Sequence, residues 1–211
     1  MSKERGVVGE HSIVSAVATD NVEDFARLAL IAAPKYLPAL YAGTHDKVHR
    51  SLFHHRDNML GFTHTCFMRV DGKNAGMTIA YDWKTNKKEQ NKTTLLIVRS
   101  MGLKFFKQMR HMQWSAENLG RMDDGTYYIA VLGFYPEFRS RGLGMEMMNF
   151  MQEKAVAAGA DKLVLDAETY HAADAARYVQ VNSTSHLLST RNVLVSLLSP
   201  GGFQYDLKAR Q

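Results

Sequence analysis

Two arginines are followed by two glycines in the segment from Arg139 to Gly144, Arg-Ser-Arg-Gly-Leu-Gly. Gly142 and Gly144 lack Cβ atoms, so the backbone can turn tightly there and successive N–H groups can point into one concavity. A helix is expected to follow, and the positive end of its dipole favours a phosphate. Arg139 and Arg141 add positive charge that suits phosphate oxygens. The segment therefore predicts an anion site, the alternative being a tight turn that needs glycine and binds nothing.

The residues around this segment predict a strand, a turn, a helix and a second strand. Residues 127–134 are apolar or aromatic, as in a buried strand, and Gly133 within them indicates a bulge or a close approach of another backbone. Apolar residues recur at helical spacing through 145–158, and residues 162–166 alternate as a strand does. The anion site would thus lie between a buried strand and an amphipathic helix.

The rest of the chain predicts three further strands and three helices. A turn sequence, Asp71-Gly72-Lys73, lies between two apolar runs and is a hairpin signal. Asp20 followed by Glu23 predicts a capping box that opens a helix. The expected strands are 12–18, 62–70 and 75–81, and the expected helices are 20–33, 44–55 and 93–119.

The helix expected over residues 44–55 carries His45 and His49 one turn apart. They could form a zinc pair, but no third ligand is in view, so we expect a polar, solvent-facing edge and no metal. Val48, Leu52 and His55 are expected on the opposite, core-facing side.

Charge and composition narrow the class of partner. The 211 residues carry 26 Lys and Arg against 21 Asp and Glu, which gives a formal charge of +5 and a pI near 9.3. Such a charge favours a polyanion, for example nucleic acid or the phosphates of CoA. No run of five or six basic residues occurs, which disfavours nucleic acid.

The single cysteine, Cys66, cannot form an intramolecular disulfide, so a reducing cytoplasmic location is expected. Cys66 is expected to be a small buried residue, the alternative being a nucleophile. No apolar leader or membrane-spanning run is visible. The basic amphipathic residues 93–119 would pack on the sheet as a helical cover, the alternative being a membrane surface.

These features resemble the GNAT N-acetyltransferase superfamily. Its acetyl-CoA signature is Arg or Gln, two residues, Gly, one residue, then Gly or Ala, matched here by Arg139, Gly142 and Gly144. Residues 12–178 fit the family's order of elements, and Gly202-Phe203 resembles the pair that opens the family's last strand. Residues 179–200 are an atypical insertion before that strand.

The resemblance implies one N-acetyltransferase domain over residues 1–211. The implied fold is of the α/β (α+β) class, with a mixed, mostly antiparallel central sheet flanked by helices and a helical insertion before the signature strand. The resemblance also implies that backbone groups of Leu132 and Phe134 pair with the pantetheine arm of acetyl-CoA as a further strand would. The implied cofactor contacts in the signature segment are Arg139, Ser140, Arg141, Gly142, Leu143, Gly144 and Met145, whose main-chain amides from Ser140 onward would hold the pyrophosphate. His171 stands where the family commonly has an asparagine near the CoA arm.

The expected chemistry is aminolysis of a thioester. A primary amine is almost wholly protonated at neutral pH, so the reaction needs a proton acceptor. The family often places a glutamate on the signature strand, but here the matching residues are Tyr127, Tyr128, Ile129 and Ala130.

Glu168 is the first candidate base, with Asp166 behind it, and a chain of water molecules is an equal competitor. The family's usual acid, a tyrosine on the following helix, corresponds to Tyr178, and direct transfer without a covalent intermediate is its usual route.

The sequence therefore predicts an acetyl-CoA-dependent N-acetyltransferase acting on an amine. The missing strand glutamate leaves an alternative open, a catalytically inactive acyl-CoA-binding sensor or interaction module. A basic nucleic-acid adaptor is a further alternative. Pairing of two copies through exposed sheet edges or through the late insertion also stays open, and the sequence does not identify the acceptor amine.

Overall fold

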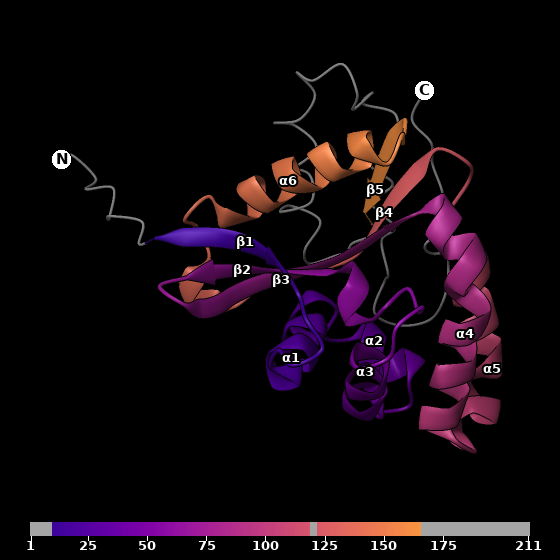
Figure 1. Cartoon of the computed structure of the whole chain (residues 1–211). Helices are drawn as coiled ribbons and strands as arrows, with labels where there is room; N and C mark the ends of the chain where they lie inside the picture. Colours follow the sequence, from indigo (N-terminus) through magenta and orange to yellow (C-terminus); the bar gives the residue numbers. More distant parts are fainter. Residues whose placement is uncertain (1–9, 119–121, 166–211) are drawn as a thin grey trace.

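A five-stranded sheet forms the centre of the molecule in the computed structural model, which describes residues 10–118 and 122–165 (Figure 1). The strand order is β1-β2-β3-β4-β5, with β4 and β5 parallel and the other pairs antiparallel. This mixed, mostly antiparallel sheet confirms the expected fold class. The strands are β1 (His11–Ser15), β2 (Thr65–Val70), β3 (Lys73–Asp82), β4 (Thr126–Phe134) and β5 (Lys162–Leu165). The helices are α1 (Val22–Ala32), α2 (Tyr36–Leu40), α3 (His45–Phe53), α4 (Trp83–Met101), α5 (Lys104–Asn118) and α6 (Leu143–Ala157), with 3₁₀ turns η1 (Phe62–His64) and η2 (Pro136–Phe138).

Helices cover both faces of the sheet, with α6 on one side and α1, α2 and α3 on the other (Figure 1). Successive residues of β3 point to opposite faces, so Met77 and Ile79 join the core beneath α1 and α3, whereas Ala80 joins the core beneath α6. Val131 and Ile129 of β4 also join opposite cores, although they are two residues apart, because the β3–β4 register shifts between them. The two cores fix the register of β3 against β4, the strand that carries the expected CoA contacts Leu132 and Phe134.

The start of α1 differs from the expected capping box. Asn21 is the N-cap, and its Oδ1 accepts a hydrogen bond from the Glu23 amide at 2.9 Å. Asp20 instead accepts from the Val17 amide at 2.8 Å and pairs with Arg69 at 2.8 Å. Asp20 is therefore wrong as the cap, because its carboxylate closes the preceding turn and binds a strand residue.

The long helix expected over residues 93–119 is two helices. Residue 102 is a glycine with φ of +57°, and α4 ends there before α5 begins. The α4 helix also begins ten residues earlier than expected, at Trp83 rather than at position 93, where Asp82 caps it by accepting from the Thr85 amide at 2.7 Å. The polar first half of α4 shows no apolar stripe, so helical periodicity could not reveal it.

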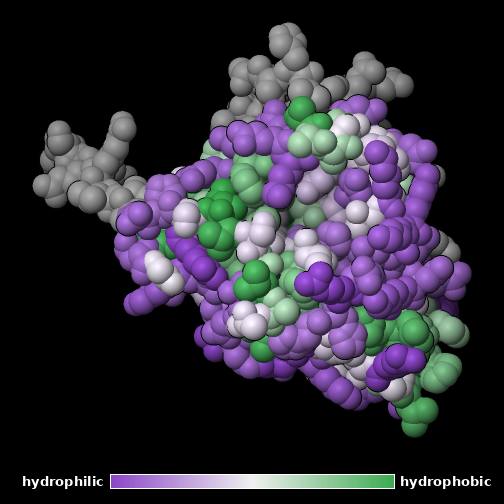
Figure 2. Space-filling model, viewed as in Figure 1, coloured by the Kyte–Doolittle hydropathy of each residue, from purple (hydrophilic) through white to green (hydrophobic). Residues whose placement is uncertain are grey.

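The helical cover expected from this segment is only partly correct. Leu96 and Met101 are buried in the core shared with α1 and α3. Leu103 and Phe106, however, are 83% and 66% exposed. Figure 2 shows apolar side chains gathered at the lower right, over the α4 and α5 helices, on a face that is otherwise mostly hydrophilic. No helix in the described part of the chain is long and apolar enough to cross a membrane.

His49 is a core residue, and the expected solvent-facing edge is wrong for it. Its ring lies 6.1 Å from that of Phe25 and 5.6 Å from that of Tyr41. Its Nδ1 lies 2.7 Å from the His45 carbonyl, so Nδ1 carries the proton that is donated to this oxygen. Burial lowers the pKa of His49 from 6.5 to about 4. His55, expected to be buried, is exposed.

We expect the buried His49 to make the fold sensitive to acid. The folded-state pKa lies below that of the unfolded chain, so the unfolded chain binds the proton first as the pH falls. The His49 contribution should be complete above about pH 6.5 and lost progressively towards pH 4, by up to about 3 kcal/mol. Urea unfolding at pH 7.5 and pH 5 tests this. His49→Gln should show a smaller pH dependence, and an unchanged dependence would contradict the expectation.

Candidate active site

A β-bulge interrupts β4 at Ala130. The register pairs Ile79 with Val131 but Ala80 with Ile129, which leaves Ala130 as the extra residue on β4. The parallel pairing with β5 ends at Ile129 opposite Leu165 among the described residues, although β4 continues to Phe134. The second half of β4 therefore runs beyond the described part of β5.

The backbone groups of Leu132 and Phe134 point away from β3. The Tyr135 amide donates to the Ala75 carbonyl at 2.9 Å, so with the register after the bulge, Gly133 also faces β3 and its two neighbours face the opposite way. That direction is the β5 side, as the expected pairing with a pantetheine arm requires. The Phe134 carbonyl already accepts from Arg139 Nε at 3.2 Å.

Gly133 permits a close approach of α1 rather than a bulge. A Cβ atom at this position would lie 2.6 Å from the carbonyl oxygen of Leu28. Of the two interpretations of Gly133 from sequence, the structure supports the close approach, and it places the bulge three residues earlier.

The glycine turn after β4 leaves a set of amides without carbonyl partners. Ser140 and Gly142 have φ of +61° and +83°, and Gly142 is the N-cap of α6. The Met145 amide donates to the Gly142 carbonyl at 3.0 Å, within the first turn of α6. No carbonyl of the described residues accepts from the amides of residues 140–144. These amides, at the positive end of a 15-residue helix, can face an anion.

The two arginines of the turn contact its backbone. Arg139 donates to Phe134, as above, and the Arg141 guanidinium donates to the Glu137 carbonyl at 2.8 Å while lying 5.3 Å from the Phe138 ring centre. Both side chains belong to exposed residues. Each guanidinium has five N–H donors, so a single hydrogen bond leaves others for a phosphate.

Glu168, Tyr178, His171 and Asp166 lie outside the described residues. The insertion at 179–200 and Gly202-Phe203 lie outside them as well.

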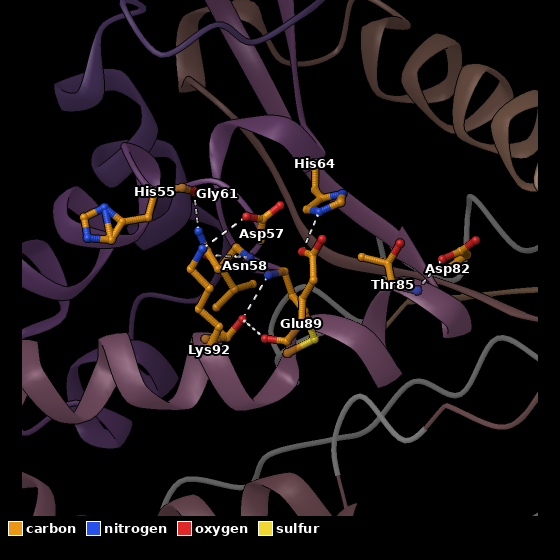
Figure 3. Close-up of polar contacts among 12 residues, drawn as sticks. His55, Asp57, Asn58, Gly61, His64, Asp82, Thr85, Glu89 and Lys92 are labelled. Carbon is orange, nitrogen blue, oxygen red and sulfur yellow. Dashed lines mark hydrogen bonds and ion pairs between the residues drawn. The ribbon is translucent and has the colours of Figure 1, made fainter.

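The structure also brings together a pair that the sequence did not indicate, His64 and Glu89. His64 Nε2 lies 2.8 Å from Glu89 Oε2, and the two side chains are 18% and 8% exposed. Figure 3 shows them pointing toward one another, His64 from the end of η1, directly before β2, and Glu89 from α4. They are 25 residues apart and belong to no motif, so only their positions in the fold reveal the pair.

A buried loop holds His64 in place. Asn58 is fully buried and donates to the Leu52 carbonyl at 3.1 Å, while the Met59 amide donates to Thr93 Oγ1 of α4 at 2.9 Å. A Cβ at Gly61 would lie 2.6 Å from the His55 carbonyl oxygen, so only glycine fits there. These contacts tie the segment before β2 to α3 and α4.

Cys66 and Tyr127 lie on the α6 side of the sheet. Burial raises the pKa of the Cys66 thiol, and it raises that of Tyr127 to about 12. Both groups are thereby kept protonated at neutral pH. This supports Cys66 as a small buried residue rather than a nucleophile, since the thiolate is the reactive form.

A bulged strand with outward-facing backbone groups, followed by amides without carbonyl partners among the described residues at the start of α6, can bind an acyl-CoA thioester. The family model for the acetyltransferase (GNAT) family matches residues 33–180. The chain belongs to this family, which uses acetyl-CoA as its co-substrate, and it is an acyl-CoA-dependent acetyltransferase.

One solved structure agrees with this assignment at the level of the fold. One acetyltransferase crystal structure is similar with a TM-score of 0.57 at 18% identity, over 81% of this chain and 87% of its own. An N-acetyltransferase from Staphylococcus aureus Mu50 has a TM-score of 0.43 at 18% identity, over 68% of this chain and 75% of its own. No curated protein sequence matches the chain.

Proposed function

We propose that this protein transfers an acetyl group from acetyl-CoA to a primary amine, which attacks the thioester directly while both substrates are bound. The observation that carries the proposal is the set of open amides at 140–144, one short turn after the outward-facing backbone of Leu132. Together they offer an anion site and a strand edge, the two parts of an acetyl-CoA site.

In this proposal the amides of residues 140–144 bind the pyrophosphate, and Arg139 and Arg141 supply charge-assisted hydrogen bonds. Leu132 and the Phe134 amide pair with the pantetheine amides. Met145 contributes through the helix rather than through its own amide, which Gly142 already accepts. The family resemblance suggests His171 as a further contact of the arm.

The proposed chemistry needs one proton acceptor and one proton donor. Glu168 is a candidate base because it follows directly after the expected strand 162–166, and Tyr178 is the acid that the family resemblance suggests. The CoA thiolate is a much weaker base than the amine, so it leaves readily even before it is protonated. The reaction therefore depends more on removing a proton from the amine than on donating one to the thiolate.

An acyl-CoA sensor without turnover is the second candidate. The observation that favours it is the residue composition of β4, where tyrosines and apolar residues occupy the strand and no carboxylate is present.

Acetyl-CoA is expected to raise the melting temperature of the protein. A ligand at 100 times its Kd adds about 2.7 kcal/mol of stability, and a protein of this size gains roughly 2–4 °C per kcal/mol. A thermal-shift series with acetyl-CoA, CoA and longer acyl-CoAs measures this. Stabilisation by none of them would overturn the proposal.

Release of free thiol in the presence of an amine panel then separates the two candidates. Thiol release that requires an amine supports the acetyltransferase, whereas tight binding without thiol release supports the sensor.

A further inference from the structure

We infer that His64 is the proton acceptor for the attacking amine and that Glu89 positions and charge-stabilises it. The inference rests on the proposed function, and it deepens it by assigning the acceptor side of the site to the α4 face of the sheet. It replaces Glu168 as base.

The His64–Glu89 hydrogen bond fixes the protonation pattern of the imidazole. A carboxylate oxygen can only accept, so the 2.8 Å contact with Glu89 Oε2 places a proton on Nε2 of His64. In the neutral ring the lone pair is then on Nδ1. A histidine whose far nitrogen is held by a carboxylate is the usual arrangement of a general base, because the carboxylate stabilises the imidazolium that forms.

A row of aromatic rings connects this pair to the bulge of β4. The rings of His64 and Tyr81 lie 6.3 Å apart, and those of Tyr81 and Tyr128 lie 5.8 Å apart. Tyr128 is paired with Tyr81 across β3 and β4 and lies two residues before the bulge at Ala130. The row therefore runs from His64 to the bulge of β4, next to Leu132, where the pantetheine arm is proposed to pair.

The pair also suits a cationic substrate. Aromatic faces attract an ammonium group, and the Glu89 side chain supplies a carboxylate that is 8% exposed and therefore little screened by solvent. The substrate class that this chemistry selects is a primary alkylamine that arrives protonated.

The proposed reaction balances as follows. The bound ammonium gives one proton to Nδ1 of His64 and becomes a neutral amine, whose nitrogen attacks the thioester carbonyl to form a C–N bond. The tetrahedral intermediate then breaks its C–S bond, and the second proton of the nitrogen passes to the departing thiolate. His64 returns its proton to solvent, so the products are the amide, CoA thiol and one released proton.

A purely structural role for the pair is testable because α4 has a second, comparable contact. Lys92 lies one turn after Glu89 and pairs with Asp57 at 3.2 Å, again joining α4 to the segment between α3 and β2 (Figure 3). Asp57→Asn weakens a contact at the same junction. The Asp57 side chain is 63% exposed, far more than that of Glu89, and it has no role in the proposed chemistry.

The test compares His64→Gln, Glu89→Gln and Asp57→Asn with the wild type. His64→Gln keeps an N–H donor towards Glu89 but removes the basic nitrogen. We expect its kcat with the best acceptor of the amine panel to fall about 100-fold, with the Kd for acetyl-CoA unchanged. Glu89→Gln should lose kcat to a smaller extent, and Asp57→Asn should keep wild-type kcat.

Acceptors of graded basicity show whether the loss concerns proton removal. In the series ethylamine, 2-fluoroethylamine and 2,2,2-trifluoroethylamine, the amine becomes progressively easier to deprotonate. The deficit of His64→Gln should shrink along the series, because a neutral amine needs no base to become nucleophilic. A structural defect would lower the rate equally for all three.

Two results would overturn the inference while leaving the proposed function intact. One is a His64→Gln enzyme with kcat close to wild type, above all if Glu168→Gln loses activity instead. The other is an equal deficit for all three amines. Acetyl-CoA binding without transfer by the wild type to any amine would overturn both the inference and the proposed function.

Discussion

Gly142→Glu is expected to abolish acetyl-CoA binding. The substitution places a carboxylate at the N-cap of α6, where the amides of residues 140–144 would face the pyrophosphate. Like charges in contact cost several kcal/mol, so the Kd should rise at least about 100-fold. Isothermal titration with acetyl-CoA, and loss of its thermal shift, measure the effect.

Gly159→Glu is the matched control for this substitution. Gly159 has φ of +74° against +83° for Gly142, and a Cβ at either glycine meets nothing within 4 Å. The backbone strain is therefore similar, at about 1–2 kcal/mol for an L-residue in this region, but Gly159 follows the opposite end of α6. We expect the control to lose stability and keep acetyl-CoA binding. Normal binding by Gly142→Glu would show that the turn is not the phosphate site.

Gly133→Ala is expected to weaken both the fold and the site. The new methyl group would lie 2.6 Å from the Leu28 carbonyl oxygen, so α1 has to move away from β4. Overpacking of this kind costs about 2–3 kcal/mol, which corresponds to roughly 5–10 °C in Tm for a protein of this size. Because Gly133 lies between Leu132 and Phe134, the KM for acetyl-CoA should rise as well.

Differential scanning calorimetry and steady-state kinetics measure these two effects. Gly159→Ala adds the same methyl group in open space and should cost only about 1 kcal/mol through its positive φ. If Gly133→Ala were as stable as Gly159→Ala, the close approach of α1 would not explain the glycine.

Local signals in the sequence predicted the framework of the site. The Asp71-Gly72 hairpin and the strand, turn and helix around Gly142 depend on contacts within a few residues, and all are present in the structure. The sequence predicted Asp20 as the N-cap of α1, but the cap is Asn21. The prediction was wrong because Asp20 pairs with Arg69, a residue on a distant strand.

Long-range features of the site could not be predicted in the same way. The burial of His49 depends on Phe25 and Tyr41, which meet it only when α1 and α3 pack together. The His64–Glu89 pair depends on the polar first half of α4, which has no apolar periodicity. The sequence therefore predicted the segment that we propose to bind the cofactor, but not the His64–Glu89 pair.

Helices α4 and α5 lie between two strand ends that are next to each other, the end of β3 and the start of β4. Asp82, the last residue of β3, is paired with Tyr127 near the start of β4, so the intervening chain closes a loop whose ends are already adjacent. The entropy of closing such a loop changes slowly with its length. A segment of different length or sequence can therefore join β3 to β4 without disturbing their pairing. Because the proposed positioning residue Glu89 lies on α4, we expect exchange of this segment to alter the choice of amine.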